Sequence, residues 1–363
     1  MVETLIYTYL AICVSMIIFN IVCIYYFHRR DKVLLRCNNR FVEDILKQIQ
    51  LEQPDEKHLK DLSKKLTKVN YLMAFDEALE RAYEKDPDRV KTYIRQLSSV
   101  FVYLTLEYLK KEKIKAAYFP YIINKYDILR GLNITLVTDA MLELVKDENL
   151  YCRENALQAL YSIGNANSVL EALKILDKSE FYHYSKMIYD GLLLFKGNRL
   201  ELDEKIWENF FSFHTTMRVT LLNYFRFSSG DYCEKILRIM IDKKEEDEIR
   251  YNCIRYFARY PYEPALSFLY DFAEQEQPFW EYTAITASAL ASYPNEKTIS
   301  VLKVLLCNPN WYVRYNAAES LNKLGLRYEE LIDVFEGKDR YAGEMLRYRF
   351  DQKRLAERRN RYE

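Results

Sequence analysis

The sequence predicts an all-α protein: a right-handed α-solenoid of stacked helix pairs, preceded by a single transmembrane helix. Three observations lead to this prediction. Glycine and proline number only eight each among 363 residues, which leaves few turn residues for a sheet protein. An uncharged apolar run opens the chain, and a helical motif returns about every 32 residues in its second half. The frequent residues, such as leucine, lysine and glutamate, are good helix formers.

The first element is the apolar run at residues 4–27, which contains no formal charge. As a helix with about 1.5 Å per residue it is roughly 36 Å long, enough to cross a hydrocarbon core of about 30 Å with some tilt. A cleaved signal peptide would need a basic start, a shorter apolar core and small residues at its end. This chain starts Met-Val-Glu and closes the run with Tyr-Tyr-Phe. We therefore assign residues 1–30 to a membrane anchor with short flanks, in contact with the lipid bilayer through residues 4–27.

The charges beside this run predict its orientation. Glu3 is the only side-chain charge before it, and Arg29, Arg30 and Lys32 follow it. Because Lys and Arg are retained on the cytoplasmic side, we expect a single-pass protein of the cell membrane with its N-terminus outside and its repeat domain in the cytoplasm. The seven cysteines are scattered, which is typical of free thiols in a reducing compartment and agrees with this placement.

The second half of the chain repeats itself. The segment YCRENALQALYSIG at residues 151–164 returns as YVRYNAAESLNKLG at residues 312–325. An anchor position recurs every 31 to 33 residues: Arg153, Lys186, Arg218, Arg250, Glu281 and Arg314. A helix breaker closes each unit: Gly164, Gly197, Gly230, Pro261, Pro294 and Gly325. Positions three and seven residues after the anchor share one helix face, and the breaker ends that helix.

A second apolar helix follows the breaker, as at residues 169–176, 233–241, 265–272 and 298–306. Two helices in a unit of this length predict a stacked solenoid, in which neighbouring units bury each other's apolar faces. The core residues that we expect on the first helices include Ala156 and Leu160 in the first unit, Tyr189 and Leu193 in the second, and Ala284 and Ser288 in the fifth.

In four units the anchor is an arginine that follows an apolar residue: Cys152-Arg153, Met217-Arg218, Ile249-Arg250 and Val313-Arg314. The usual signature of the HEAT-repeat (armadillo-like) family is an acidic turn, a Val-Arg pair, a small residue and a terminal glycine, and about residues 147–335 resemble that family. The resemblance implies a fold and is nearly silent about function. Two interpretations of these arginines stay open: structural anchors that reach acidic groups of the neighbouring repeat, or a ladder of ligand-binding side chains. Lys186 and Glu281 depart from the pattern.

We divide the rest of the chain by the strength of this pattern. Residues 31–146 form an irregular helical N-terminal part of the solenoid, and residues 147–337 form about six HEAT-like repeats. Residues 338–363 form a basic C-terminal helix or tail, with nine basic and five acidic side chains. We interpret this tail either as a helix that caps the solenoid or as a contact with a partner or with anionic lipid. The residues that would make that contact are Tyr341, Met345, Arg347, Tyr348 and Arg354.

Motifs for catalysis are missing from the sequence. The four histidines form no metal-ligand pair with another His or a Cys at close helical spacing. No Cys-x-x-Cys, phosphate-binding loop or Gly-x-Ser-x-Gly elbow occurs. We therefore expect no catalytic residues, no metal, no cofactor and no enzyme activity. The net charge of zero also argues against a nucleic-acid partner.

For the function, we expect a non-catalytic membrane-tethered scaffold or accessory subunit that binds a membrane-associated protein. One N-terminal span followed by HEAT repeats resembles bacterial proteins that accompany membrane glycosyltransferases. That resemblance implies a glycosyltransferase of cell-surface or exopolysaccharide synthesis as the partner. Two other readings stay open: an enzyme that resembles the HEAT-like bilin lyases, and a nucleic-acid-binding protein that resembles the HEAT-like DNA glycosylases.

Overall fold

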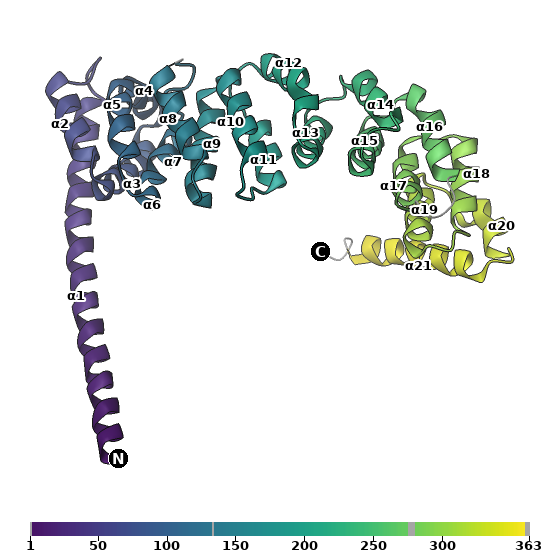
Figure 1. The fold of residues 1–363 in the computed structure, drawn as a ribbon, viewed down its shortest axis with the longest axis horizontal. Coiled ribbons are helices and arrows are strands. Elements are labelled where there is room, and N and C mark those ends of the chain that lie inside the picture. Colours follow the sequence, from purple (N-terminus) through teal and green to yellow (C-terminus); the bar gives the residue numbers. More distant parts are fainter. Residues whose placement is uncertain (1, 133, 275–279, 360–363) are drawn as a thin grey trace. The chain divides into compact units, whose positions relative to one another are not determined.

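The computed structural model describes residues 2–132, 134–274 and 280–359. Within these residues the protein contains 21 α-helices, three short 3-10 helices and no strand. The chain forms two compact units (Figure 1): unit 1 comprises Met1–His183 and Leu194–Glu208, and unit 2 comprises Tyr184–Leu193 and Asn209–Glu363. The all-α class and the pairing of helices are therefore confirmed, while the hand of the solenoid stays a prediction.

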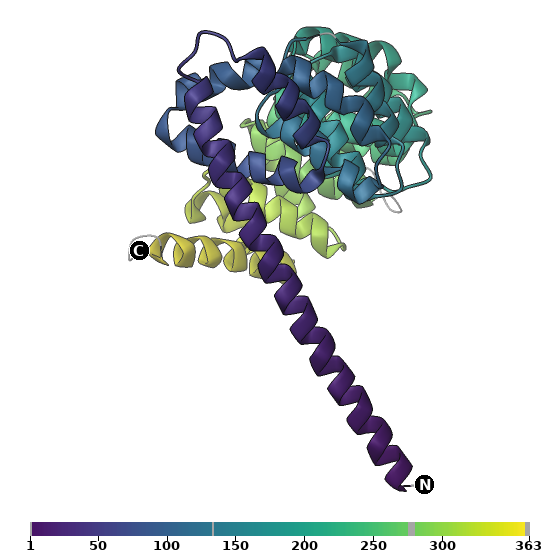
Figure 2. The ribbon, with the colours of Figure 1, turned by 90° about the vertical axis from the view of Figure 1, so that its left-hand side faces the viewer.

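The first helix, α1 (Val2–Gln48), is continuous over 47 residues and about 70 Å long at 1.5 Å per residue. Its sequence holds no Gly or Pro that would break it. The segment Ile6–Tyr26 is apolar, is not buried, and is long enough to cross a membrane. Further along, the buried ring of Phe41 meets the ring of Phe75 edge-on, with centroids 5.5 Å apart. One end of α1 thus belongs to the core of unit 1, and the apolar end projects from it (Figure 2).

Unit 1 continues with a series of shorter helices: α2 (Glu56–Leu66), α3 (Val69–Lys85), α4 (Pro87–Gln96), α5 (Ser98–Leu109), α6 (Lys113–Ala116), α7 (Tyr118–Lys125), α8 (Thr135–Val145), α9 (Leu150–Ile163), α10 (Ala166–Lys178) and most of α12 (Arg199–Asn209). Short polar side chains begin several of them, because their oxygens accept hydrogen bonds from amides that lack a partner within the helix. The Asn149 side chain accepts one from the Cys152 amide at the start of α9, at 3.1 Å.

Unit 2 contains the remaining helices: α11 (Ser185–Leu193), η1 (Phe210–Ser212), α13 (Thr215–Ser228), α14 (Cys233–Ile241), α15 (Asp247–Arg259), α16 (Glu263–Glu274), α17 (Trp280–Ala289), η2 (Leu290–Ser292), α18 (Glu296–Leu305), α19 (Trp311–Lys323), η3 (Tyr328–Leu331), α20 (Ile332–Phe335) and α21 (Arg340–Arg359). Helices α11, α13, α15, α17 and α19 pack successively, and α14, α16 and α18 each pack against the first helix of the next pair. Each pair therefore covers the apolar face of its neighbour, as stacked repeats require.

Most repeat helices bury the face that the sequence pattern predicts. Three residues after the anchor, Ala156 and Cys253 are fully buried. Seven residues after it, Leu160 and Phe257 are also fully buried. In these helices the anchor arginine and the apolar face keep a fixed register.

Two helices depart from that register, so three predicted core residues were wrong. In α11 the buried residues are Ile188 and Leu192, one position before Tyr189 and Leu193, which are only half-buried. In α17 the residue at the predicted position, Ser288, is exposed. Neither unit has an arginine anchor to hold the register: Lys186 is exposed and pairs with Asp190 Oδ2 of its own helix at 2.5 Å. In addition, α17 tightens into the 3-10 helix η2, which rotates its last turn.

Candidate functional site

The anchor Arg153 in α9 is buried, with 3% of its surface exposed. Its Nη1 donates to the carbonyl oxygens of Asp147 and Glu148, both at 2.8 Å. Its Nη2 donates to the carbonyl oxygen of Tyr182 at 2.8 Å, and its guanidinium lies 5.6 Å from the ring centroid of Phe181. The side chain thereby ties the turn ahead of α9 to the segment that follows α10, within unit 1.

Two anchors in unit 2 use different partners for a similar purpose. Arg218 in α13 pairs through Nη2 with Glu245 Oε1 at 2.7 Å, in the turn before α15. Arg250 in α15 donates from Nε to the carbonyl oxygen of Met240 at 2.9 Å. Its Nη1 donates to the hydroxyl of Tyr282, in α17, at 2.9 Å. Both guanidinium groups therefore link neighbouring helix pairs.

The last anchor, Arg314 in α19, donates to the carbonyl oxygen of Asn308 at 2.9 Å and lies 5.6 Å from the ring centroid of Tyr341 in α21. The contacts of the four arginines favour structural anchors over a ligand ladder. The expected acidic partner is present at Arg218, whereas the other three use carbonyl oxygens, a hydroxyl or an aromatic ring.

A cluster of large aromatic side chains lies on α17, α19 and α21, and the sequence reasoning missed it. We call Trp280, Trp311, Tyr312, Tyr315 and Arg349 the aromatic surface. The ring of Tyr312 stacks on Trp280 with centroids 5.6 Å apart, and Trp311 stacks on Tyr315 at 4.9 Å. The Arg349 guanidinium lies 4.6 Å from the Tyr315 centroid, and its Nη1 donates to the Tyr315 hydroxyl at 2.9 Å.

The aromatic surface has the composition of a protein-binding site. Trp311 and Tyr312 are 48% and 58% exposed, although each carries a large apolar ring. Trp, Tyr and Arg dominate the energetically important centres of protein interfaces because they bury much area at a small cost in conformational entropy. A signal was present in the sequence: the last repeat begins with Trp-Tyr, where the first begins with Leu-Tyr.

The residues predicted for the C-terminal contact do not share one environment. Tyr341 and Tyr348 are exposed by 66% and 52%, as a partner or lipid contact requires. Met345 is 8% exposed and packs in the core of unit 2, so it cannot lie on the same open stripe. The Arg347 guanidinium lies 5.8 Å from the ring centroid of Phe335, and the side chain of Arg354 lies outside the described residues.

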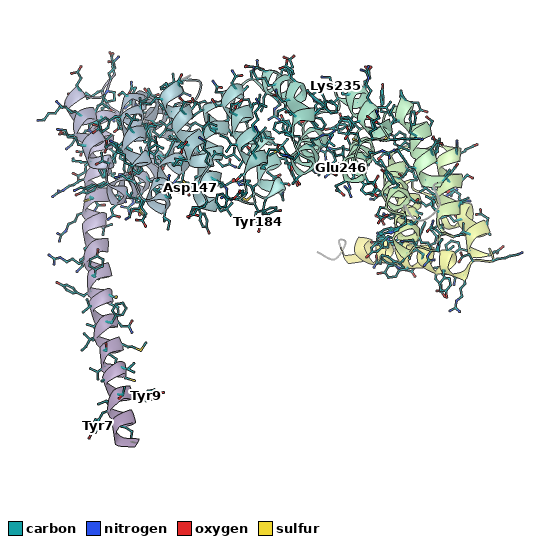
Figure 3. All side chains as sticks on the ribbon, viewed as in Figure 1. Tyr7, Tyr9, Asp147, Tyr184, Lys235 and Glu246 are labelled. Carbon is teal, nitrogen blue, oxygen red and sulfur yellow. The ribbon has the colours of Figure 1, made fainter. Side chains whose placement is uncertain are left out.

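The described side chains at the two ends of the apolar run are exposed. Tyr7 and Tyr9 are exposed by 72% and 67%, and Figure 3 shows both side chains pointing away from the helix near its N-terminal end. Arg29 and Lys32 are exposed at the other end, and the Arg30 side chain lies outside the described residues.

Two of the cysteines lie in the core of the described part of the chain. Cys152 and Cys253 are buried. Burial raises the pKa of the Cys152 thiol to about 11, which keeps it from forming a reactive thiolate at neutral pH. Among the described residues, no three or more His, Cys, Asp or Glu side chains lie close enough together to hold a metal ion.

Comparison with known proteins gives one family and a distant structure. A family model of HEAT repeats matches residues 275–339. The chain is also similar to the solved structure of human deoxyhypusine hydroxylase in complex with glycerol, with 15% sequence identity and a TM-score of 0.28. That match covers 82% of this chain and 96% of the other. The curated proteins give no match.

This comparison corrects one sequence-based prediction. We predicted that the chain is not an enzyme, and the similar solved structure is that of an enzyme, a hydroxylase. The absence of known motifs therefore does not exclude catalysis, and that prediction is withdrawn. The likeness itself assigns no activity or substrate to this chain.

Two observations about the repeats agree with each other. The family model matches the last repeats, and the described helices form pairs that pack successively along the chain. Residues 275–339 therefore match HEAT repeats, and the described helices before and after them form the stacked helix pairs of an α-solenoid, with one apolar helix at the N-terminal end.

Proposed function

We propose that this protein is a membrane-tethered scaffold, anchored by α1, whose HEAT repeats bind a membrane-associated protein. The observation that carries this proposal is the segment Ile6–Tyr26, which is apolar, fully open and continuous with a helix of the folded core. Exposure of apolar surface to water costs roughly 25 cal/mol of free energy per Å², so insertion into lipid strongly stabilises a helix of this kind. Tethering also raises the effective concentration of the repeats toward other membrane proteins.

The aromatic surface is the binding site that we propose for this partner. It presents two exposed rings, those of Trp311 and Tyr312, and each ring stacks on a neighbouring aromatic side chain. Rings held in place in this way lose little conformational entropy when a partner covers them. The exposed Tyr341 in α21 lies next to the anchor of α19 and extends the candidate surface.

The finer proposal is that the partner is a membrane glycosyltransferase of cell-surface or exopolysaccharide synthesis. What supports it is the order of the parts, one apolar N-terminal helix followed by HEAT repeats, which resembles bacterial proteins that accompany such enzymes. We also propose that the N-terminus lies outside the cell and the repeats lie in the cytoplasm. The exposed Arg29 and Lys32 after the apolar segment support it.

Membrane anchoring and orientation are tested together. The full chain should float with membranes and resist carbonate extraction, whereas a chain without residues 1–27 should remain soluble. A variant that keeps only Cys307, which is exposed, should react with an impermeant maleimide only after the cells are permeabilised. The matched variant Glu3→Cys in a cysteine-free background should react in intact cells. A chain shortened by cleavage after residue 27, or the reverse labelling pattern, would contradict the proposal.

The partner is tested by crosslinking from the aromatic surface in native membranes. A photoreactive amino acid at position 312 should crosslink to a membrane glycosyltransferase identified by mass spectrometry. The same group at position 304 provides the control, since Val304 is 70% exposed on α18 and lies outside the aromatic surface. The double change Trp311→Ala and Tyr312→Ala should abolish copurification of that enzyme while Val304→Ala leaves it intact. Equal crosslinking from positions 312 and 304 would contradict the aromatic surface as the binding site. Crosslinking to an enzyme of another class would contradict the proposal that the partner is a glycosyltransferase.

A further inference from the structure

Unit 1 contains a cavity of about 1120 Å³ that the repeat pattern does not explain. Its walls come from the C-terminal half of α3, from α4, and from residues 125–132, at the end of α7 and in the loop after it. A cavity of this size can hold one small organic molecule. A scaffold that binds another protein by its surface does not need such a cavity.

One wall of the cavity has a strained backbone. Asp127 and Leu129 have φ angles of 52° and 69°, in the left-handed region that L side chains rarely adopt. The segment is held by the rest of unit 1: Ser162 Oγ donates to Asp127 Oδ1 at 2.9 Å, and the Gly131 amide donates to the carbonyl oxygen of Ile163 at 3.0 Å. Strain of this kind persists where the surrounding structure fixes it, and such positions gather at ligand sites.

Asp76, itself 5% exposed, immobilises the neighbouring part of the same wall. Its carboxylate accepts hydrogen bonds from Tyr118 Oη, Lys125 Nζ and Tyr126 Oη, each at 2.6 Å. Lys125 also pairs with Glu80 Oε1 at 2.7 Å. Burial and the Asp76 carboxylate raise the pKa of Tyr126, so its hydroxyl stays protonated and remains a donor. The wall is therefore rigid before any ligand arrives.

The lining of the cavity carries four cationic side chains and three acidic ones: Lys91, Arg95, Lys125 and Arg130, and Glu80, Glu84 and Asp127. Lys125 is paired with Glu80 and with the buried Asp76, and Asp127 is paired with Lys196, which lies outside the lining. Lys91 makes an exposed contact of 3.8 Å with Asp88 and lies 5.6 Å from the ring centroid of Tyr83. Arg95 of α4 and Arg130 of the strained segment are both exposed and pair with no carboxylate among the described residues. The acid left to oppose them in the lining is Glu84.

The cavity also offers an apolar surface beside these arginines. Tyr83 and Leu132 are 37% and 43% exposed, and the buried side chains of Ile94 and Leu129 contribute to the lining. We propose that the cavity binds an organic anion, with a phosphate or carboxylate group held by Arg95 and Arg130 and an apolar or aromatic body against Tyr83 and Leu132. A guanidinium fork matches both anionic groups with two parallel hydrogen bonds.

The probes for this site are phenyl phosphate, benzoate and the neutral analogue phenol, added to the full chain in detergent or nanodiscs. Dissociation constants come from ligand-observed NMR. Both anions should bind at least tenfold more tightly than phenol, and the tighter of the two identifies the group that the arginines prefer. Anions that bind no better than phenol would overturn the proposal.

Three variants separate the site from a general effect of charge. Arg95→Gln with Arg130→Gln should weaken the anions tenfold or more and leave phenol unchanged. Arg89→Gln, also on α4 but outside the lining, should leave all three unchanged. Glu84→Gln should tighten anion binding roughly threefold by removing a repulsive charge, a gain that misfolding cannot produce. Unchanged anion affinity in the arginine variant, or weaker binding in Glu84→Gln, would refute the assignment.

Discussion

Gly197 shows how closely two turns of unit 1 approach each other. A Cβ added to Gly197 would lie 2.0 Å from the carbonyl oxygen of Gly164 and 2.5 Å from the Phe195 ring. We predict that Gly197→Ala destabilises the protein by about 2 kcal/mol, because the backbone of Gly164 must move to admit the methyl group. The midpoint of urea unfolding, followed by circular dichroism, measures this loss.

Gly343→Ala is the matched control for that change. Its Cβ would lie 3.8 Å from the nearest atom, an ordinary contact, and alanine is the better helix former. The control variant should unfold at an equal or higher urea concentration. If both variants unfold at the same midpoint, the close approach of the two turns does not exist in solution.

For single residues, the sequence predicted the local role of a residue better than it predicted which distant residues it contacts. Gly164 was expected to end a helix, and it ends α9 with a φ of 82°. Its contact with Gly197 could not be predicted, because it depends on how two turns from different repeats come together. The strained Asp127 and Leu129 were also missed, since a single Asp is a weak signal for a left-handed backbone and Leu gives none.

Among the helices, the contacts of Arg153 lead to a prediction about α9. Lysine has one compact charge in place of a planar fork, so it cannot reach all three carbonyl oxygens that Arg153 contacts. Arg153→Lys should destabilise the turn around α9 by about 2 kcal/mol, since hydrogen bonds to a charged group contribute that much when buried. Hydrogen exchange in peptides covering residues 147–163 should accelerate by about thirtyfold.

Arg81→Lys is the control for that helix variant. Arg81 is exposed and makes one hydrogen bond of 3.2 Å to Asn39, so its replacement should leave exchange unchanged throughout unit 1. Equal acceleration of hydrogen exchange in both variants would show that Arg153 does not stabilise its repeat more than an exposed arginine does.

Helix periodicity predicted the face of a helix wherever an arginine held its register. The second helices at residues 233–241 and 298–306 were found close to their observed bounds in α14 and α18. The register slipped in α11 and α17, where Lys186 and Glu281 replace the arginine. The aromatic surface was missed for a related reason: it combines α17, α19 and α21, and periodicity describes one helix at a time.

For the molecule as a whole, the buried and half-buried tyrosines predict its response to alkaline pH. Burial raises the pKa of Tyr251 and of Tyr293 to about 12, and it raises those of Tyr93, Tyr108 and Tyr256 as well. Above pH 10, the ordinary tyrosine pKa, the unfolded chain therefore binds fewer protons than the folded one. The free energy of unfolding should be insensitive to these groups below about pH 10 and should fall as pH rises above it.

Absorbance at 295 nm, recorded beside circular dichroism, checks this expectation. The buried tyrosines should ionise only as helical structure is lost, so part of the absorbance change should coincide with unfolding. Complete ionisation near pH 10 with the helices intact would show that these side chains are open to solvent.

The class of the whole molecule was within reach of the sequence, because scarce breakers and a repeated unit restrict the architecture strongly. The function was not, since the same repeats serve unrelated activities. The exclusion of enzyme activity shows this most clearly: missing motifs describe known reaction centres, and say nothing of a centre built from residues far apart in the chain.

The unbroken α1 has a mechanical consequence under the proposed anchoring. With no proline or glycine where the helix would leave the lipid, residues 28–48 act as a stiff lever of about 30 Å. Tilting the embedded segment by about 20°, as a thinner bilayer demands, swings the far end sideways by about 10 Å. Bilayer thickness would then change the position at which the first repeats meet a partner protein, although the packing within these repeats stays the same.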